Sequence, residues 1–180
     1  MYGMVNRSLE EMVTAQHGGE EWEAIKKEAG IDIDVFVSIE AYPDQVTYSL
    51  VAAAANRLGT STVEFLERFG VHWVTQTADR HYAGLMWAGG STLPEFLHNL
   101  NTFHERVSLI FPYLDPPSFA CTDIRDNSVR LHYYSFRPGL THFVKGLLIG
   151  LGLRFETPVS VAIAADRSTG SDHDEFLVSW

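Results

Sequence analysis

The chain has only one cysteine, Cys121, among its 180 residues, which excludes a disulfide bond within it. Basic side chains are also scarce: 13 Lys and Arg stand against 23 Asp and Glu and give a formal net charge of −10. Such an acidic protein repels phosphate backbones and anionic lipid surfaces. No segment approaches the roughly 20 apolar residues that a membrane-spanning helix needs. The composition therefore argues against nucleic-acid and membrane roles.

Signatures of catalysis and export are missing as well. The sequence contains no glycine-rich phosphate loop and no nucleophile elbow, so a hydrolase or a nucleotide-dependent enzyme has little support. The opening segment, MYGMVNRSLEEM, lacks the apolar core of a signal peptide. We therefore expect a protein of the cytoplasm that is not an enzyme.

What the sequence does contain is apolar and aromatic material. Apolar residues make up 46 % of the chain and aromatic residues 12 %, and 180 residues suffice for one domain whose core can enclose a cofactor. We expect a single domain over residues 1–180.

The first two thirds of the chain show helical periodicity. Apolar residues at helical spacing predict helices near residues 9–15, 22–29 and 45–58, and glycines at 30 and 59 are typical helix ends. Ser61 and Glu64 form a capping box for a fourth helix that continues to Trp73. Residues 85–87 belong to a short segment of uncertain type.

A further helix carries the most informative histidine. Ser91 or Thr92 can cap it, and the apolar spacing runs through Leu97, Leu100, His104 and Val107 to about Phe111. This spacing predicts one continuous helix with His104 on its inward face. A histidine on an apolar face is by itself more often a core residue than a metal ligand.

The last third alternates like β-strands. Two strands, residues 119–123 and 129–136, are expected to form a hairpin after a proline-rich crossing, and residues 140–155 read as an apolar helix. Residues 158–165 and 176–180 are expected to pair around a polar turn. The fold class is therefore α+β, with a helical half followed by an antiparallel sheet of about four strands and a packed helix.

Three polar residues at period two on the second strand strengthen the functional interpretation of His104. Tyr133, Ser135 and Arg137 should project to the same side of a strand. A guanidinium and two hydroxyls can bind the two carboxylates of a porphyrin, while an imidazole can bind its iron. The alternative is a solvated strand face, whose opposite face, with Arg130 and His132, should then be clearly more apolar; it is not.

These residues match a known family along the whole chain. The matching motifs are Leu100-Asn101-x-x-His104, the pair Pro116 and Pro117, and Tyr133-x-Ser135-x-Arg137, together with the Met-Tyr-Gly opening. On these motifs the chain resembles the heme nitric oxide/oxygen binding (H-NOX) domain, including the heme domain of soluble guanylate cyclase. The resemblance implies an H-NOX fold that encloses heme b (protoporphyrin IX iron), with His104 as its proximal ligand.

The resemblance also assigns roles around the heme. Pro117 is expected to press on the macrocycle and keep it bent, and Phe143 and Trp73 correspond to the distal wall. Family members that hold oxygen place a tyrosine hydroxyl at the position of Phe143. Its absence argues for a sensor of nitric oxide, which also binds carbon monoxide, and the indole of Trp73 leaves stable oxygen binding open. Nitric oxide weakens the bond opposite to it, so the expected signal is release of His104 and relaxation of the heme.

The output partner is not encoded here. Resemblance implies a histidine kinase, a cyclic-dinucleotide enzyme, a chemotaxis receptor or a nucleotide cyclase. A domain that uses the same cavity for an apolar organic ligand without a metal, or acts as an adaptor, is the alternative. A second polar cluster, residues 172–175, has metal-ligand chemistry but reads as a solvated turn between strands.

Overall fold

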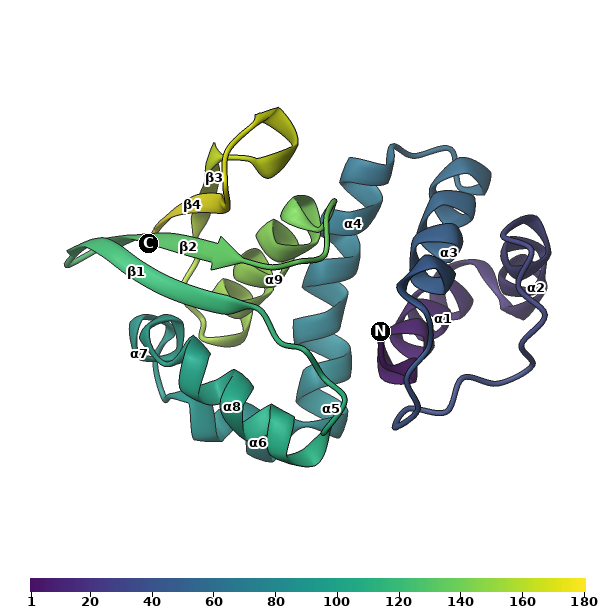
Figure 1. The fold of residues 1–180 in the computed structure, drawn as a ribbon, viewed down its shortest axis with the longest axis horizontal. Coiled ribbons are helices and arrows are strands. Elements are labelled where there is room, and N and C mark those ends of the chain that lie inside the picture. Colours follow the sequence, from purple (N-terminus) through teal and green to yellow (C-terminus); the bar gives the residue numbers. More distant parts are fainter. The chain divides into compact units, whose positions relative to one another are not determined.

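The computed structural model describes all residues from Met1 to Trp180 and consists of two compact units, Met1–Phe69 and Gly70–Trp180. The division falls inside one helix, α4 (Thr62–His72). The first unit is helical, and the second carries all strands of the sheet (Figure 1). This confirms the predicted α+β class, with helices first and an antiparallel sheet after them.

The three helices predicted before the capping box are present in the first unit, and a glycine follows each of them within two residues. The helices before α4 are α1 (Gly3–His17), α2 (Gly19–Glu28) and α3 (Asp44–Arg57). Gly18, Gly30 and Gly59 follow them with φ of 87°, 68° and 63°. Residues other than glycine rarely adopt such positive φ values. Their buried side chains, among them Leu9, Trp22 and Leu50, form the core of this unit.

The predicted capping box opens α4. The backbone N–H of Glu64 donates to Oγ of Ser61 at 3.2 Å, and the N–H of Ser61 donates to Oε2 of Glu64 at 3.2 Å. Two amides that lack partners within the helix are thereby satisfied. The helix continues beyond His72 as a π-helical segment, η1 (Trp73–Ala78).

The second unit continues with short helices. They are α5 (Asp79–His81), α6 (Ala83–Gly89), α7 (Leu93–His98) and α8 (Leu100–Ile110). The segment of uncertain type, residues 85–87, is therefore helical. Oγ1 of Thr92 accepts from the N–H of Glu95 and caps α7.

The prediction of one continuous helix through His104 was wrong. Asn99, with φ −90° and ψ 6°, separates α7 from α8. Its side-chain amide donates to the carbonyl oxygen of Gly89 at 3.1 Å, an interaction with a residue outside both helices. Because α8 starts anew at Leu100, His104 lies in its second turn.

The sheet is antiparallel with the strand order β1-β2-β4-β3. Its strands are β1 (Ser118–Arg125), β2 (Ser128–Tyr134), β3 (Ser160–Ala165) and β4 (Asp174–Ser179). Helix α9 (Thr141–Arg154) packs against the sheet, and its Val144, Leu148 and Leu151 share one core with Leu131 and Phe176. No helix combines the length and the apolar composition needed to cross a bilayer.

The second strand ends earlier than predicted. Pairing with β1 stops at Tyr134 opposite Ser118, so Tyr133 lies in β2 while Ser135 and Arg137 lie beyond it. Pro117 precedes Ser118 and has no amide hydrogen with which to extend the ladder. The prediction that Tyr133, Ser135 and Arg137 lie on one face of a single strand was therefore wrong.

Candidate functional site

His104 is held in one tautomer by its own helix. Its Nδ1 lies 2.8 Å from the carbonyl oxygen of Leu100, and a carbonyl can only accept, so the proton is on Nδ1. Nε2 therefore keeps its lone pair, which is the form in which imidazole binds a metal. Burial lowers the pKa of His104 below its usual value, although the bond to Leu100 opposes this, and the lowering favours the neutral ring.

Aromatic rings surround the imidazole. The ring centroids of Phe103 and Phe119 lie 5.3 and 5.2 Å from that of His104, and Tyr133 lies 5.5 Å beyond Phe119. These rings come from α8, β1 and β2. His104 and Tyr133, two of the residues predicted from the sequence, are thus joined through a third aromatic side chain. Pro117 is partly buried immediately before β1.

Tyr133, Ser135 and Arg137 are brought together although the strand ends between them. Tyr133 is buried, which raises the pKa of its hydroxyl, and a hydrogen bond with Ser135 partly opposes that shift. Oγ of Ser135 also accepts from the backbone N–H of Arg137 at 3.1 Å. Hydrogen bonds through Ser135, in the bend after β2, thus keep these three residues close together in place of a continuous strand.

The guanidinium of Arg137 is positioned by its neighbours. Its Nη1 donates to the carbonyl oxygen of Asp115 at 2.9 Å, and its Cζ lies 4.4 Å from the ring centroid of Phe136. Arg167, from the turn between β3 and β4, donates to the carbonyl oxygen of Ser135. Arg167 was not among the predicted site residues, because 32 residues separate it from Ser135 along the chain and no local pattern joins the two.

The residues expected in the distal wall lie on two helical segments in contact. Trp73 is the first residue of η1 and Phe143 lies in the first turn of α9; both are partly buried. Gly70, in the last turn of α4 just before η1, also lies close to α9: an added Cβ there would be 2.3 Å from the carbonyl oxygen of Phe143. Single π-helical turns are rare and are frequent at functional sites.

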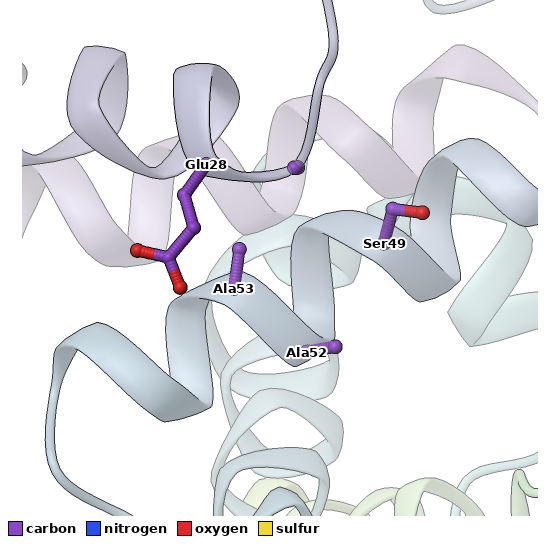
Figure 2. A pocket seen from close by; sticks show the side chains of 5 residues that line it. Glu28, Ser49, Ala52 and Ala53 are labelled. Carbon is purple, nitrogen blue, oxygen red and sulfur yellow. The ribbon is translucent and has the colours of Figure 1, made fainter.

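A surface pocket of about 310 Å³ lies elsewhere, in the first unit (Figure 2). Its lining comes from the end of α2 and one side of α3: Glu28, Ala29, Ser49, Ala52 and Ala53. Glu28 already accepts a hydrogen bond from Asn56 at 2.7 Å. This pocket contains none of the predicted site residues and no histidine or cysteine.

Comparisons with known proteins agree with these observations. The family described as Haem-NO-binding matches residues 2–163. Among curated proteins, the Caenorhabditis elegans soluble guanylate cyclases gcy-35 and gcy-37 are each 30% identical to the chain, over 91% and 82% of it. The chain spans only 24% and 21% of the length of these relatives.

Solved structures share the fold. An H-NOX protein from S. oneidensis in the Fe(II)NO ligation state superposes with a TM-score of 0.89 at 23% identity, covering 99% of this chain and 98% of that one. An Fe(II) unliganded H-NOX protein from K. algicida gives 0.85 at 22% identity, covering 99% and 96%. With the family match over residues 2–163, the conclusion is that this chain belongs to the haem-NO-binding, or H-NOX, family.

Proposed function

We propose that residues 1–180 act as one heme-based gas-sensing domain that binds nitric oxide and carbon monoxide at a ferrous heme b held by His104. The observation that carries this proposal is the 2.8 Å contact of Nδ1 of His104 with the carbonyl oxygen of Leu100, which leaves Nε2 as a lone-pair donor. Family membership and the aromatic surroundings of the ring support it. When bound, heme supplies an iron with a coordination position open to a diatomic gas.

The donor set near β2 fits the acidic groups of a porphyrin. Tyr133 and Ser135 offer hydroxyls, and Arg137 can turn its guanidinium from a backbone carbonyl to a carboxylate, which it binds more strongly. In this proposal these residues hold the propionates, and Pro117 contacts the macrocycle from the loop that leads into β1. Arg167 supports the backbone of Ser135.

The proposed distal wall decides which gas is retained. Phe143 offers no hydrogen-bond donor, and oxygen gains more from a donor than nitric oxide or carbon monoxide does. The indole of Trp73 is the group in this wall that could donate. We therefore propose a nitric oxide sensor that discriminates against oxygen.

We propose that the signal is a movement of α8, the helix that contains His104. Release of His104 frees α8 to move, and the gas shifts this equilibrium only by its difference in affinity for the two states. The partner is proposed from the relatives: since gcy-35 and gcy-37 are soluble guanylate cyclases, a nucleotide cyclase is one candidate. A histidine kinase, a cyclic-dinucleotide enzyme and a chemotaxis receptor are the others, and we propose that the domain works in the cytoplasm without turnover of its own.

Visible absorption tests the proposal directly. Protein reconstituted with hemin and reduced without oxygen should show an intense Soret band that shifts on addition of nitric oxide. The variant His104→Gly should lose most of this pigment and regain it when imidazole is added. His98→Ala is the matched control, because His98 is exposed on α7 and should leave the spectrum unchanged.

Two outcomes would contradict the proposal. The first is wild-type protein that remains colourless after reconstitution, which would favour an apolar-ligand or adaptor domain. The second is an unchanged Soret band in His104→Gly without imidazole, which would assign the iron to a different side chain.

A further inference from the structure

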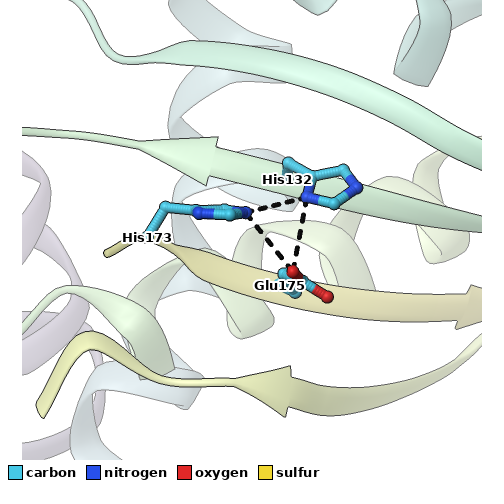
Figure 3. A group of neighbouring side chains, drawn as sticks. All are labelled: His132, His173 and Glu175. Carbon is cyan, nitrogen blue, oxygen red and sulfur yellow. Dashed lines mark hydrogen bonds and ion pairs between the residues drawn. The ribbon is translucent and has the colours of Figure 1, made fainter. Parts of the chain in front are cut away.

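A second group of possible ligands lies on the face of the sheet opposite the core. Along β2, Leu131 and Tyr133 are buried, whereas His132 between them points to the other side. Glu175 of β4 is its direct cross-strand partner, and His173 immediately precedes β4 (Figure 3). The sequence pointed to a solvated turn here, because His132 is 41 residues from His173 and only the strand pairing joins them.

We propose that His132, His173 and Glu175 bind a divalent transition-metal ion of the Zn²⁺ class. The ligand atoms are Nδ1 of His132, Nε2 of His173 and Oε1 of Glu175, which lie within 4.8 Å of one another. Two imidazoles and one carboxylate are a donor set that Zn²⁺ takes in proteins. The proposal concerns this surface alone and does not rest on the proposed heme function.

The distances suit one small ion. Nδ1 of His132 lies 2.8 Å from Nε2 of His173, and Oε1 of Glu175 lies 3.6 Å from the former and 3.4 Å from the latter. A point equidistant from these atoms lies roughly 1.9 Å from each, and Zn²⁺ bonds nitrogen and oxygen at about 2.0–2.2 Å. An ion just outside the plane of the three atoms therefore reaches all of them and keeps a fourth position for water.

The outer nitrogens of both rings already have partners. Nδ1 of His173 lies 2.5 Å from Oδ1 of Asp172, and a carboxylate fixes the proton on that nitrogen. Nε2 of His132 lies 2.7 Å from Oγ1 of Thr122. When both rings are neutral, Nε2 of His173 and Oε1 of Glu175 are thus both acceptors, and Nδ1 of His132 has at most one proton to donate between them. A cation satisfies all three at once.

Charge and packing favour the same conclusion. Arg130 binds Oε2 of Glu175 and Oδ2 of Asp123, each at 2.9 Å, and so directs Oε1 of Glu175 toward the histidines. With Asp172, three carboxylates stand against one guanidinium around the site. The ring of Tyr134 stacks on His173 with centroids 4.3 Å apart and fixes its orientation. The side chains of His132, His173 and Glu175 are only 14%, 13% and 22% exposed, so the ligand atoms are largely preorganised.

Calorimetric titration with zinc chloride at neutral pH tests the proposal. Heme-loaded protein should bind one equivalent at this site, and His104→Ala without heme should bind it equally. Failure of heme binding and failure of the zinc site are therefore distinguishable. His132→Gln and His173→Gln should each abolish the stoichiometric binding, whereas the exposed His98→Gln should retain it.

A variant that leaves all three ligands in place provides a second measurement. Asp172→Asn should weaken zinc about 10–100-fold, as loss of a residue that orients a ligating histidine does. Co²⁺ bound to the wild type should show the visible bands of a tetrahedral centre, and zinc should raise the melting temperature of the wild type but not that of His173→Gln. Absence of one-equivalent binding, or equal binding by the wild type and both histidine variants, would overturn the proposal.

Discussion

Asn101 and Phe119 form a closed pair of hydrogen bonds. The side-chain amide of Asn101 donates to the carbonyl oxygen of Phe119 at 2.6 Å, and the backbone N–H of Phe119 donates to Oδ1 of Asn101 at 2.7 Å. This contact joins α8 to β1 and positions the ring that packs on His104. The sequence showed Asn101 only as a motif residue, and the structure gives it a positioning contact.

Replacement of this side chain should affect both stability and the site. Asn101→Ala removes two hydrogen bonds and leaves the backbone of Phe119 to water, so we expect a loss of about 1–3 kcal/mol in the free energy of unfolding. Urea denaturation measures the loss, and the rate of heme dissociation should rise in parallel. Asn127→Ala, in the β1–β2 turn, is the control, because its side chain is remote from the site.

The three residues proposed to bind the propionates should contribute unequally to heme retention. Arg137→Ala should release heme fastest, because a hydrogen bond that involves a charged group contributes about 1.5–3 kcal/mol against roughly 1 kcal/mol for a neutral one. Tyr133→Phe and Ser135→Ala should have smaller effects. Transfer of heme to an apo-globin acceptor measures the rates, and equal rates in all three variants would contradict the assignment.

Gas selectivity should depend on Phe143. The reduced wild type exposed to air should form no stable oxygen complex, whereas Phe143→Tyr should form one with a slower release of oxygen. Trp73→Phe removes the indole donor and tests whether that group contributes. Stopped-flow absorption provides the rates. A stable oxygen complex of the wild type that disappears in Trp73→Phe would assign selectivity to the indole.

The lowered pKa of His104 predicts a pH dependence in heme-free protein. Above about pH 6.5 the ring is neutral in the folded and in the unfolded chain. As the pH falls below this value, the unfolded chain takes up a proton before the folded chain does, so His104 lowers the stability at acid pH. Wild type should therefore lose more stability than His104→Gln between about pH 7 and pH 5 in urea denaturation. Parallel losses in both proteins would show that other groups dominate.

Gly70 should tolerate no side chain. In Gly70→Ala the new Cβ would overlap the backbone of Phe143, and we expect a loss of about 1–3 kcal/mol in the free energy of unfolding. Gly84→Ala is the matched control, since this exposed helical glycine has nothing within 4 Å of an added Cβ. It should be neutral or stabilising by up to about 1 kcal/mol. Thermal unfolding of both variants makes the comparison.

Local patterns predicted the helices well because their determinants are close in sequence. The capping box of Ser61 and Glu64 joins residues three apart, and the apolar spacing of α1 repeats every three or four residues. The break at Asn99 was missed because its side chain binds Gly89, ten residues away. Neighbours along the chain do not encode such a contact.

For the candidate site, residue types were predictable and geometry was not. His104 and Tyr133 were identified from motifs, and the structure links them through Phe119. The end of β2 depends on where its partner strand stops, and that position is not visible in the sequence of β2. The prediction that Ser135 and Arg137 lie on a common strand face was therefore wrong. The pairing of His132 with Glu175 likewise requires the register of β2 against β4.

Neighbouring residues of β2 face opposite sides of the sheet. Tyr133 lies on the side of the aromatic rings near His104, and His132 lies on the other side as part of the proposed zinc site. A strand alternates with every residue, so deletion or insertion of a single amino acid in β2 would exchange the two sides. Both sites would then be lost in one event. A substitution in β2 changes a side chain on one side of the sheet alone. A change in the number of residues in β2 alters both sides, so the His104 site and the zinc site each constrain the length of this strand.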